Sequence, residues 1–304
     1  MITIRLADHT DITRQKDLWQ LCFGDPPEFI DLYYRERFDP QQTLLLFKDG
    51  QLSSMLTMLP AYLHFASGPP TSSVIIYAVA THPHFRNQGL AGRLIDAASQ
   101  LIVAGGFLYS IIVPAQKTLF DFYRRLGYHE SFVVSELSIK KDSIKNNTVD
   151  NSFVPFLSAA EPQQYLSLRE SLLNKNPHVS YYLRDIVYQQ SISRHSGADI
   201  HLLHNKNSVY DFNDLFGVAA IEIINKNKVI IKDLLTKDKH LDKAIISISK
   251  VYPANEYIVR APAFSSSKIV STGSIRCFAM IRSHSLGASL KYIPPDAYMG
   301  LAFD

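Results

Sequence analysis

The stretch AVATHPHFRNQGLAGRLIDAA, residues 78–98, decides the fold of this chain of 304 residues. It begins inside a β-branched and aromatic run, VIIYAVAT (74–81), whose lack of alternation predicts a strand covered on both faces. A helical pattern over residues 90–104 follows the turn. At such a junction the first backbone N–H groups of the helix lack intrahelical partners, and with the helix dipole they form an anion site.

The side chains of this turn suit a phosphate ligand better than bond-making chemistry. Gly89 lets the backbone approach a ligand without a Cβ, and Ala91 and Gly92 keep the first helical turn thin. Arg86 offers a guanidinium to phosphate oxygens or braces the loop. The alternative interpretation is an ordinary helix start with small residues for packing, because an Arg-x-x-Gly-x-(Gly/Ala) pattern arises by chance in roughly one such chain in ten.

A second motif, QKTLFDFYRRLGY (116–128), follows after another expected strand, FLYSIIV. Together the two motifs resemble the GNAT acetyltransferase superfamily, whose signature is a strand, Arg/Gln-x-x-Gly-x-Gly/Ala, a helix, a further strand and Asn-x-x-Ala-x-x-(Phe/Leu)-Tyr-x-x-(Lys/Arg)-Leu-Gly-(Phe/Tyr). The resemblance covers about residues 2–140. The chain departs from the family at Gln116, where Asn is usual, and at Leu119, where Ala is usual.

The resemblance implies acetyl-coenzyme A as the donor. Backbone N–H groups of residues 88–92 would bind its pyrophosphate, and the backbone of residues 78–80 would pair with the pantetheine arm as an added strand. Tyr123 would protonate the leaving thiolate as a general acid, or else is a core aromatic on an amphipathic helix. The implied donor-binding residues are Ala78, Val79, Ala80, Arg86, Asn87, Gln88, Gly89, Leu90, Ala91, Gly92 and Gln116.

The general base is left open between several carboxylates. The strand before the turn has no Asp or Glu, although some family members carry a Glu there. Asp25 and Glu28, which follow the first expected helix, are candidates for bordering the acceptor site. The layout also resembles the first two domains of enhanced-intracellular-survival type acetyltransferases, in which the terminal carboxylate points into the first domain's site. That resemblance adds Asp304 as a candidate base, although the third, sterol-carrier-like domain of those proteins does not fit this length.

The order of elements predicts two α/β (α+β) domains, each a mixed twisted sheet flanked by helices. The polar run KKDSIKNNTVDNS suggests a boundary, giving a donor-binding GNAT domain at 1–140, a linker at 141–152 and a degenerate GNAT-like domain at 153–304. The second domain is expected to include a helix at 179–191 and a strand at 298–304.

The second domain lacks the phosphate loop. Its equivalent junction, residues 228–248, has no glycine and carries Asp238 and Asp242 where a pyrophosphate would have to approach. The sequence therefore predicts that this domain binds no coenzyme A and shapes the acceptor cleft or an oligomer contact instead.

Composition excludes several other classes of function. The net charge of +3 is too small for a nucleic-acid surface. Cys22 and Cys277 have no zinc-ligand spacing, and His82 and His84 are interpreted as a solvent-facing turn, so no metal is expected. The chain shows neither a signal peptide nor a membrane span, which predicts a cytoplasmic protein.

The leading hypothesis is an acetyl-coenzyme A-dependent N-acetyltransferase that transfers acetyl directly to a primary amine on a small molecule or a peptide. This hypothesis is compatible with a homo-oligomer. The alternative is a non-catalytic acyl-coenzyme A sensor or scaffold whose degenerate half binds a partner. The sequence does not favour a dinucleotide oxidoreductase, because NQGLAG is not a Gly-x-Gly-x-x-Gly loop and no acidic residue ends the next strand.

Overall fold

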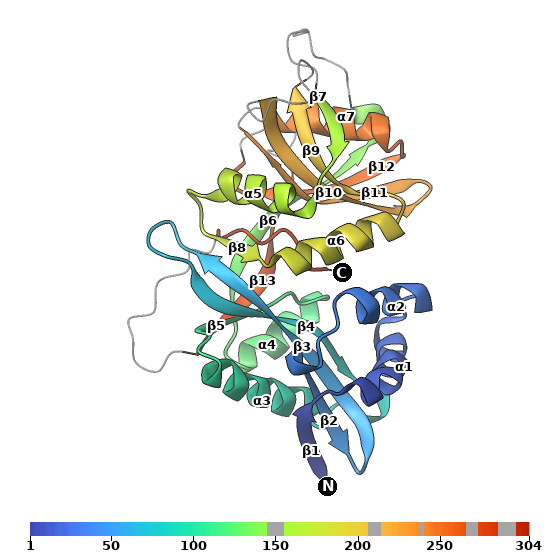
Figure 1. The fold of residues 1–304 in the computed structure, drawn as a ribbon, viewed down its shortest axis with the longest axis vertical. Coiled ribbons are helices and arrows are strands. Elements are labelled where there is room, and N and C mark those ends of the chain that lie inside the picture. The colour runs from blue at the N-terminus through green and yellow to red at the C-terminus, as the bar shows by residue number, and fades with distance from the viewer. Residues whose placement is uncertain (145–154, 206–213, 238–239, 266–272, 285–295, 304) are drawn as a thin grey trace. The chain divides into compact units, whose positions relative to one another are not determined.

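The computed structural model describes residues 1–144, 155–205, 214–237, 240–265, 273–284 and 296–303 (Figure 1). The chain forms two compact units. Unit 1 contains Met1–Ser131, Val179–Tyr182 and Ala279–Ile293, and unit 2 contains Phe132–His178, Leu183–Phe278 and Pro294–Asp304. Each unit therefore includes short segments from the other half of the sequence.

Unit 1 is a mixed sheet with helices. Its strand order is β1-β2-β3-β4-β5, and β13 follows at the β5 edge. The first pairings are antiparallel, and the β4–β5 pairing is parallel. The elements are β1 (Ile2–Leu6), α1 (Ile12–Phe23), α2 (Pro27–Glu36), β2 (Thr43–Lys48), β3 (Gln51–His64), β4 (Thr71–Thr81), α3 (Leu90–Ala104), β5 (Tyr109–Ile112), α4 (Lys117–Arg125) and the part of β13 (Ser274–Ser283) from Ala279 onward. A short strand, β8 (His178–Tyr181), pairs with β3.

Local sequence signals explain where several of these elements begin and end. Asp49 and Gly50 have φ of 50° and 81°, the left-handed conformations that a two-residue hairpin between β2 and β3 requires. Pro27 occupies the first turn of α2, where its missing N–H costs nothing. Gly127, at φ of 85°, follows the end of α4.

Unit 2 repeats this plan. Its strand order is β7-β9-β10-β11-β12, with β6 at the β12 edge, and only the β11–β12 pairing is parallel. The elements are the part of β6 (His129–Lys140) from Phe132 onward, β7 (Pro155–Ala159), α5 (Pro162–Leu173), α6 (Leu183–His195), β9 (Ile200–Asn205), β10 (Leu215–Asn225), β11 (Lys228–Thr236), α7 (Leu241–Val251) and β12 (Glu256–Pro262). The order strand, two helices, three antiparallel strands, helix, parallel strand thus occurs in both units.

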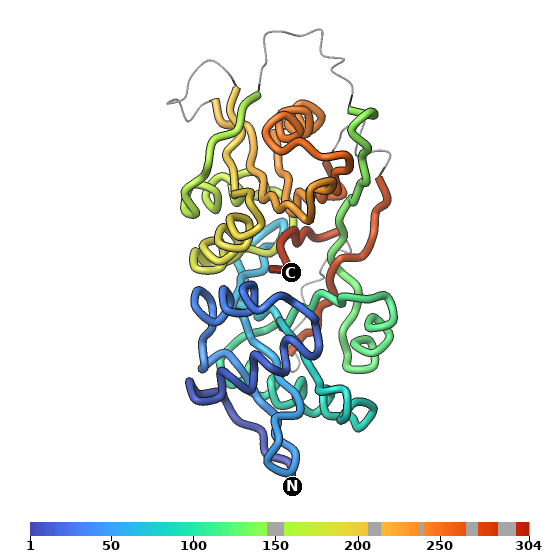
Figure 2. Tube along the Cα trace, turned by 90° about the vertical axis from the view of Figure 1, so that its right-hand side faces the viewer, coloured from blue at the N-terminus to red at the C-terminus, as the bar shows by residue number. Residues whose placement is uncertain are grey.

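The last strand of each sheet is exchanged between the two halves of the sequence. β6 follows α4 along the chain, yet its residues 134–140 pair with β12 in unit 2. Residues 280–283 of β13 pair with β5 in unit 1. In Figure 2, β6 lies in the green part of the tube and β13 in the red-orange part; their registers place β6 beside β12 and β13 beside β5.

Substitution of Leu94 tests how much the core packing of unit 1 contributes to stability. It lies on α3, is 0% exposed, and belongs to the core that α3 forms with the sheet. We expect Leu94→Ala to lower the free energy of unfolding by about 2–5 kcal/mol, because it leaves a cavity that neighbours fill only in part. Val103→Ala on the same helix, at a side chain 50% exposed, should stay within about 0.5 kcal/mol of wild type. Urea unfolding of both variants measures the difference.

The predicted α/β architecture is confirmed, and two local predictions are wrong. The expected helix at 179–191 is instead strand β8 followed by α6, because the Val-Ser-Tyr run pairs with β3. The expected strand at 298–304 is reduced to isolated bridges at Ala297 and Tyr298. In the described part of the chain, no helix has the length and apolar character that crossing a membrane requires.

Candidate functional site

Strand β4 separates from β5 in the middle of unit 1. The parallel ladder between them covers Ser73–Ile76 of β4 and stops there, while the ladder with β3 continues to Thr81. A bulge interrupts the ladder with β3, and Ala78 within it has φ of 50°. Among the described residues, the β5-facing edge of β4 therefore has no ladder partner over residues 78–80. These are the positions at which an added extended ligand can pair with the strand.

The loop after β4 presents backbone N–H groups at the start of α3. The helix begins at Leu90, and its cap residue Gly89 has φ of 72° and makes no side-chain capping bond. A glycine suits this conformation, and a Cβ at this position would point into open space. Asn87 also has positive φ, at 62°. The start of α3 thus has the uncapped N–H groups that the prediction of an anion site requires, and residues 86–89 are exposed.

Side chains brace this loop from several directions. The Arg86 Nε donates to the carbonyl oxygen of Thr81 at 3.1 Å, which ties the loop to the end of β4. His82 Nδ1 accepts from the backbone N–H of His84 at 3.2 Å, and both imidazole rings contact Phe85. These contacts agree with the interpretation of the two histidines as parts of a turn.

Lys48 is a cation beside the loop that the motif analysis missed. Its Nζ lies 2.5 Å from Oε1 of Gln88 and 5.6 Å from the centre of the Phe85 ring. The amide nitrogen of Gln88 in turn donates to the carbonyl oxygen of His84 at 3.4 Å. Lys48 comes from the end of β2, so no local pattern around the loop indicates it. Its positive charge adds to the electrostatic attraction of the loop for an anion.

Tyr123 is held inside the α4 packing layer. Its side chain is 5% exposed, and its ring contacts the rings of Phe122 and Tyr128 with centroid distances of 5.0 and 6.0 Å. Among the described residues, its hydroxyl makes no hydrogen bond. Burial raises the pKa of Tyr123, so the phenol keeps its proton at neutral pH. Gln116 precedes the helix as its cap residue and makes no side-chain capping bond.

An aromatic cluster packs on the other face of β4, beside the bulge. The Trp19 ring lies 4.8 Å from that of Tyr33 and 5.8 Å from that of Tyr77, the residue before Ala78. The Trp19 Nε1 donates to Oδ2 of Asp25 at 2.7 Å. The structure therefore fixes Asp25 through a side chain that contacts β4.

The other candidate bases are less constrained. Glu28 is exposed in the first turn of α2 and makes no hydrogen bond or ion pair with the described residues. Asp304 lies outside the described residues, and its neighbour Phe303 is fully buried in unit 2.

The equivalent junction in unit 2, residues 228–248, contains no glycine. Helix α7 begins at Leu241 after His240, which has φ of −104°, and Asp242 lies in the first turn. An aspartate in this position repels a phosphate and replaces it as partner of the helix dipole. Asp238 lies outside the described residues. The absence of coenzyme A binding by unit 2 stays a prediction.

Comparison with known proteins identifies the first part of the chain. Residues 3–130 match the acetyltransferase (GNAT) domain family. No curated protein sequence matches the chain.

Several solved structures resemble nearly the whole chain at low sequence identity. A GCN5-related N-acetyltransferase from Anabaena variabilis is 14% identical with a TM-score of 0.72, covering 94% of this chain and 73% of its own. Eis1 from Mycobacterium abscessus is 12% identical with a TM-score of 0.65, covering 93% and 74%. A tandem GNAT protein from the clavulanic acid biosynthesis pathway is 14% identical with a TM-score of 0.58, covering 95% and 100%. At these identities the likeness shows a shared fold.

Proposed function

Starting from the acetyltransferase (GNAT) domain that residues 3–130 form, we propose that the protein transfers acetyl from acetyl-coenzyme A to a primary amine. The observation that carries the proposal is that strand β4 has, among the described residues, an unpaired edge and leads into an uncapped helix start. β4 loses its parallel partner at Ile76, and the same strand leads into the uncapped start of α3. One extended, phosphate-bearing ligand fits both features at once.

The donor would bind mainly through backbone groups. Its pantetheine arm would pair with residues 78–80, and its pyrophosphate would accept from N–H groups of residues 88–92. Arg86 and Lys48 would add positive charge, although each already braces the loop in the structure. The acceptor side of the site would be the face of β4 that carries the Trp19 cluster.

The proposed reaction is a direct transfer. The amine nitrogen attacks the thioester carbonyl carbon, a C–N bond forms, and the C–S bond breaks. Tyr123 gives its proton to the departing thiolate, and a carboxylate or water takes the proton that the amine loses. Because the buried phenol strongly resists ionisation, it must regain a proton within each turnover.

Three carboxylates are candidates for accepting the amine proton. Asp25 is the best supported of the described ones, because Trp19 holds it and Trp19 contacts Tyr77 beside the bulge. Glu28 and Asp304 are retained as proposals.

Binding and turnover by the purified chain test the proposal. Acetyl-coenzyme A at a hundred times its Kd should raise the free energy of unfolding by about 2.7 kcal/mol. Acetyl-pantetheine, which lacks the pyrophosphate, should bind at least about tenfold more weakly if the start of α3 holds phosphate. Release of free thiol in the presence of a panel of primary amines then measures transfer.

Two results separate this proposal from its alternatives. Absence of any thermal shift with saturating acetyl-coenzyme A would refute donor binding. Tight binding without thiol release over the amine panel would instead support the non-catalytic acyl-coenzyme A sensor or scaffold.

A further inference from the structure

Strand β11 of unit 2 repeats the geometry that makes β4 a donor strand. Its parallel ladder with β12 covers Lys228–Ile231 and stops, as the β4–β5 ladder stops at Ile76. A register shift follows at Lys232, in the ladder with β10. Past this point, among the residues that the structure describes, β11 continues along its antiparallel neighbour alone, as β4 does. If the proposed function is right, this is the place in unit 2 that corresponds to the pantetheine arm in unit 1.

The C-terminal segment, residues 297–303, lies at this place. The ladder between β12 and β6 ends at Val134 of β6, and Ala297 bridges to Phe132 directly beyond it. The backbone N–H of Val133 donates to the carbonyl oxygen of Ala297 at 3.1 Å. The segment therefore pairs with β6 at the residues directly beyond the end of the β12 ladder.

The rest of the segment is also fixed within unit 2. The backbone N–H of Tyr298 donates to the carbonyl oxygen of Pro177 at 2.8 Å. The Phe303 ring lies 6.2 Å from that of Tyr188 on α6, and the red end of the chain passes beside this helix in Figure 1. All residues from Ala297 to Phe303 are buried.

Asp233 binds this segment from β11. It is the second residue after the end of the parallel ladder, the position that Ala78 holds in β4, and it is 0% exposed. Its Oδ1 accepts from the Tyr298 hydroxyl. A Cβ on Gly300 would lie 2.2 Å from the same oxygen, so only glycine fits there. The side chain at this position of unit 2 thus reaches the C-terminal segment at two residues.

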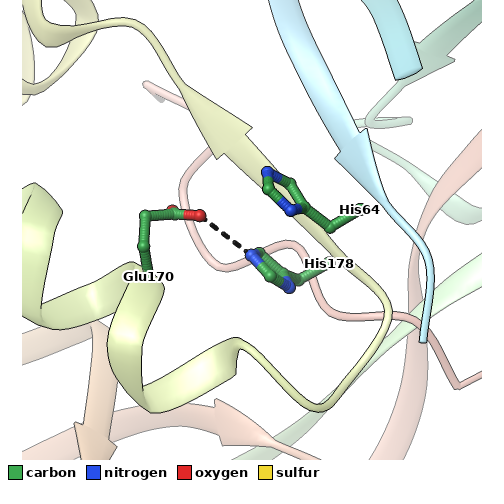
Figure 3. Close-up of side chains that lie close together, drawn as sticks. All are labelled: His64, Glu170 and His178. Atoms are coloured by element: carbon green, nitrogen blue, oxygen red, sulfur yellow. Dashed lines mark hydrogen bonds and ion pairs between the residues drawn. The ribbon is translucent and has the colours of Figure 1, made fainter. Parts of the chain in front are cut away.

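Helix α5 neutralises the buried carboxylate. Oδ2 of Asp233 accepts from the Tyr165 hydroxyl at 2.6 Å and from Arg169 Nε at 3.0 Å. Arg169, also 0% exposed, donates a second bond to Glu170 at 3.2 Å. Glu170 in turn lies 3.0 Å from Nε2 of His178, which Figure 3 shows as a dashed line. Buried charges are stable only when paired in this way, so the network favours one position of the segment.

We propose that residues 297–303 are the internal ligand of unit 2. They occupy the position where unit 1 takes the acyl donor, and Asp233 holds them there through Tyr298. Unit 2 is closed to a second donor by its own chain, in addition to lacking the phosphate loop. One chain therefore binds one molecule of coenzyme A.

Hydrogen exchange on the full-length chain tests the anchoring without any donor. In wild type, the backbone amides of the segment should exchange slowly, as those of a buried strand do. Tyr298→Phe should speed their exchange by about tenfold through the loss of one hydrogen bond to a charged group. Asp233→Asn should speed it at least about a hundredfold, because it removes the carboxylate that bonds both the Tyr298 hydroxyl and Arg169 Nε inside the protein. Tyr252→Phe is the matched control, because its hydroxyl bonds His201 elsewhere in unit 2.

The outcomes decide the proposal separately from the proposed function. Wild-type exchange at the rate of an unstructured peptide, or an equal acceleration in Tyr252→Phe and Tyr298→Phe, would overturn it. If Asp233→Asn unfolds unit 2 as a whole, Tyr298→Phe alone decides. Titration with coenzyme A measures how many molecules bind per chain, and two bound molecules would also overturn the proposal. Failure of coenzyme A to bind at all would refute the proposed function and leave the exchange result standing.

Discussion

Gly89→Glu should weaken the binding of acetyl-coenzyme A at least about a hundredfold. The substitution places a carboxylate at the start of α3, where the proposed function puts a pyrophosphate. At about 4 Å and an effective dielectric constant of 20, one pair of like charges costs about 4 kcal/mol, so a loss of at least about a hundredfold in Kd is a cautious expectation. Calorimetric titration measures the loss directly.

Gly106→Glu is the matched control for this experiment. Gly106 follows the other end of α3, has φ of 75° against 72° for Gly89, and likewise has open space where a Cβ would be. Both variants therefore carry the same left-handed strain of about 1–2 kcal/mol and the same added charge. Only Gly89→Glu should lose the donor. Equal Kd values for the two variants would rule out the start of α3 as the phosphate site.

Tyr123→Phe should lower kcat by about 10²–10⁴-fold while changing the Kd of the donor little, since general acid catalysis contributes that much. Phenylalanine has the same ring as tyrosine, so the contacts of residue 123 with Phe122 and Tyr128 remain. Burial raises the pKa of Tyr123 above its ordinary value near 10, and a general acid must carry its proton. The rate should therefore not fall between about pH 7 and 10 through ionisation of this phenol. Steady-state kinetics over that range provide the measurement.

Tyr128→Phe controls for the loss of a buried phenol oxygen. The Tyr128 hydroxyl bonds Ser110 Oγ at 2.8 Å, so its removal should cost about 1 kcal/mol of stability and leave kcat within about threefold of wild type. If Tyr123→Phe and Tyr128→Phe have the same kcat, Tyr123 is a packing residue and the general acid lies elsewhere.

Helix ends and turns that depend on a few neighbouring residues could be predicted well. The helix expected at 90–104 is α3, Leu90–Ala104, because Gly89 and Gly105 flank a clear apolar stripe. The Asp49-Gly50 turn is similarly local. The loop at residues 86–92 is an uncapped helix start, which its glycine and small residues indicate without reference to the rest of the chain.

Features that depend on distant pairing could not be predicted. Val179–Tyr181 form a strand because they pair with β3. No pattern in the residues around them indicates this pairing. Lys48 reaches the loop from β2, 40 positions before Gln88. Asp233 follows Lys232 in an otherwise apolar run, and nothing in that run indicates that Arg169 and Tyr298 bind its carboxylate. In each case the deciding partner is far away in sequence.

The exchange of β6 and β13 bears on the ancestry of the chain and on its dissection. Each sheet is completed by a strand from the opposite half of the sequence, as in a domain-swapped dimer. The arrangement is the one expected if two identical single-unit proteins traded their last strands before their genes were joined. Cutting between residues 144 and 155 should thus yield two fragments that each lack one strand of their sheet and recover the native pairing only when expressed together.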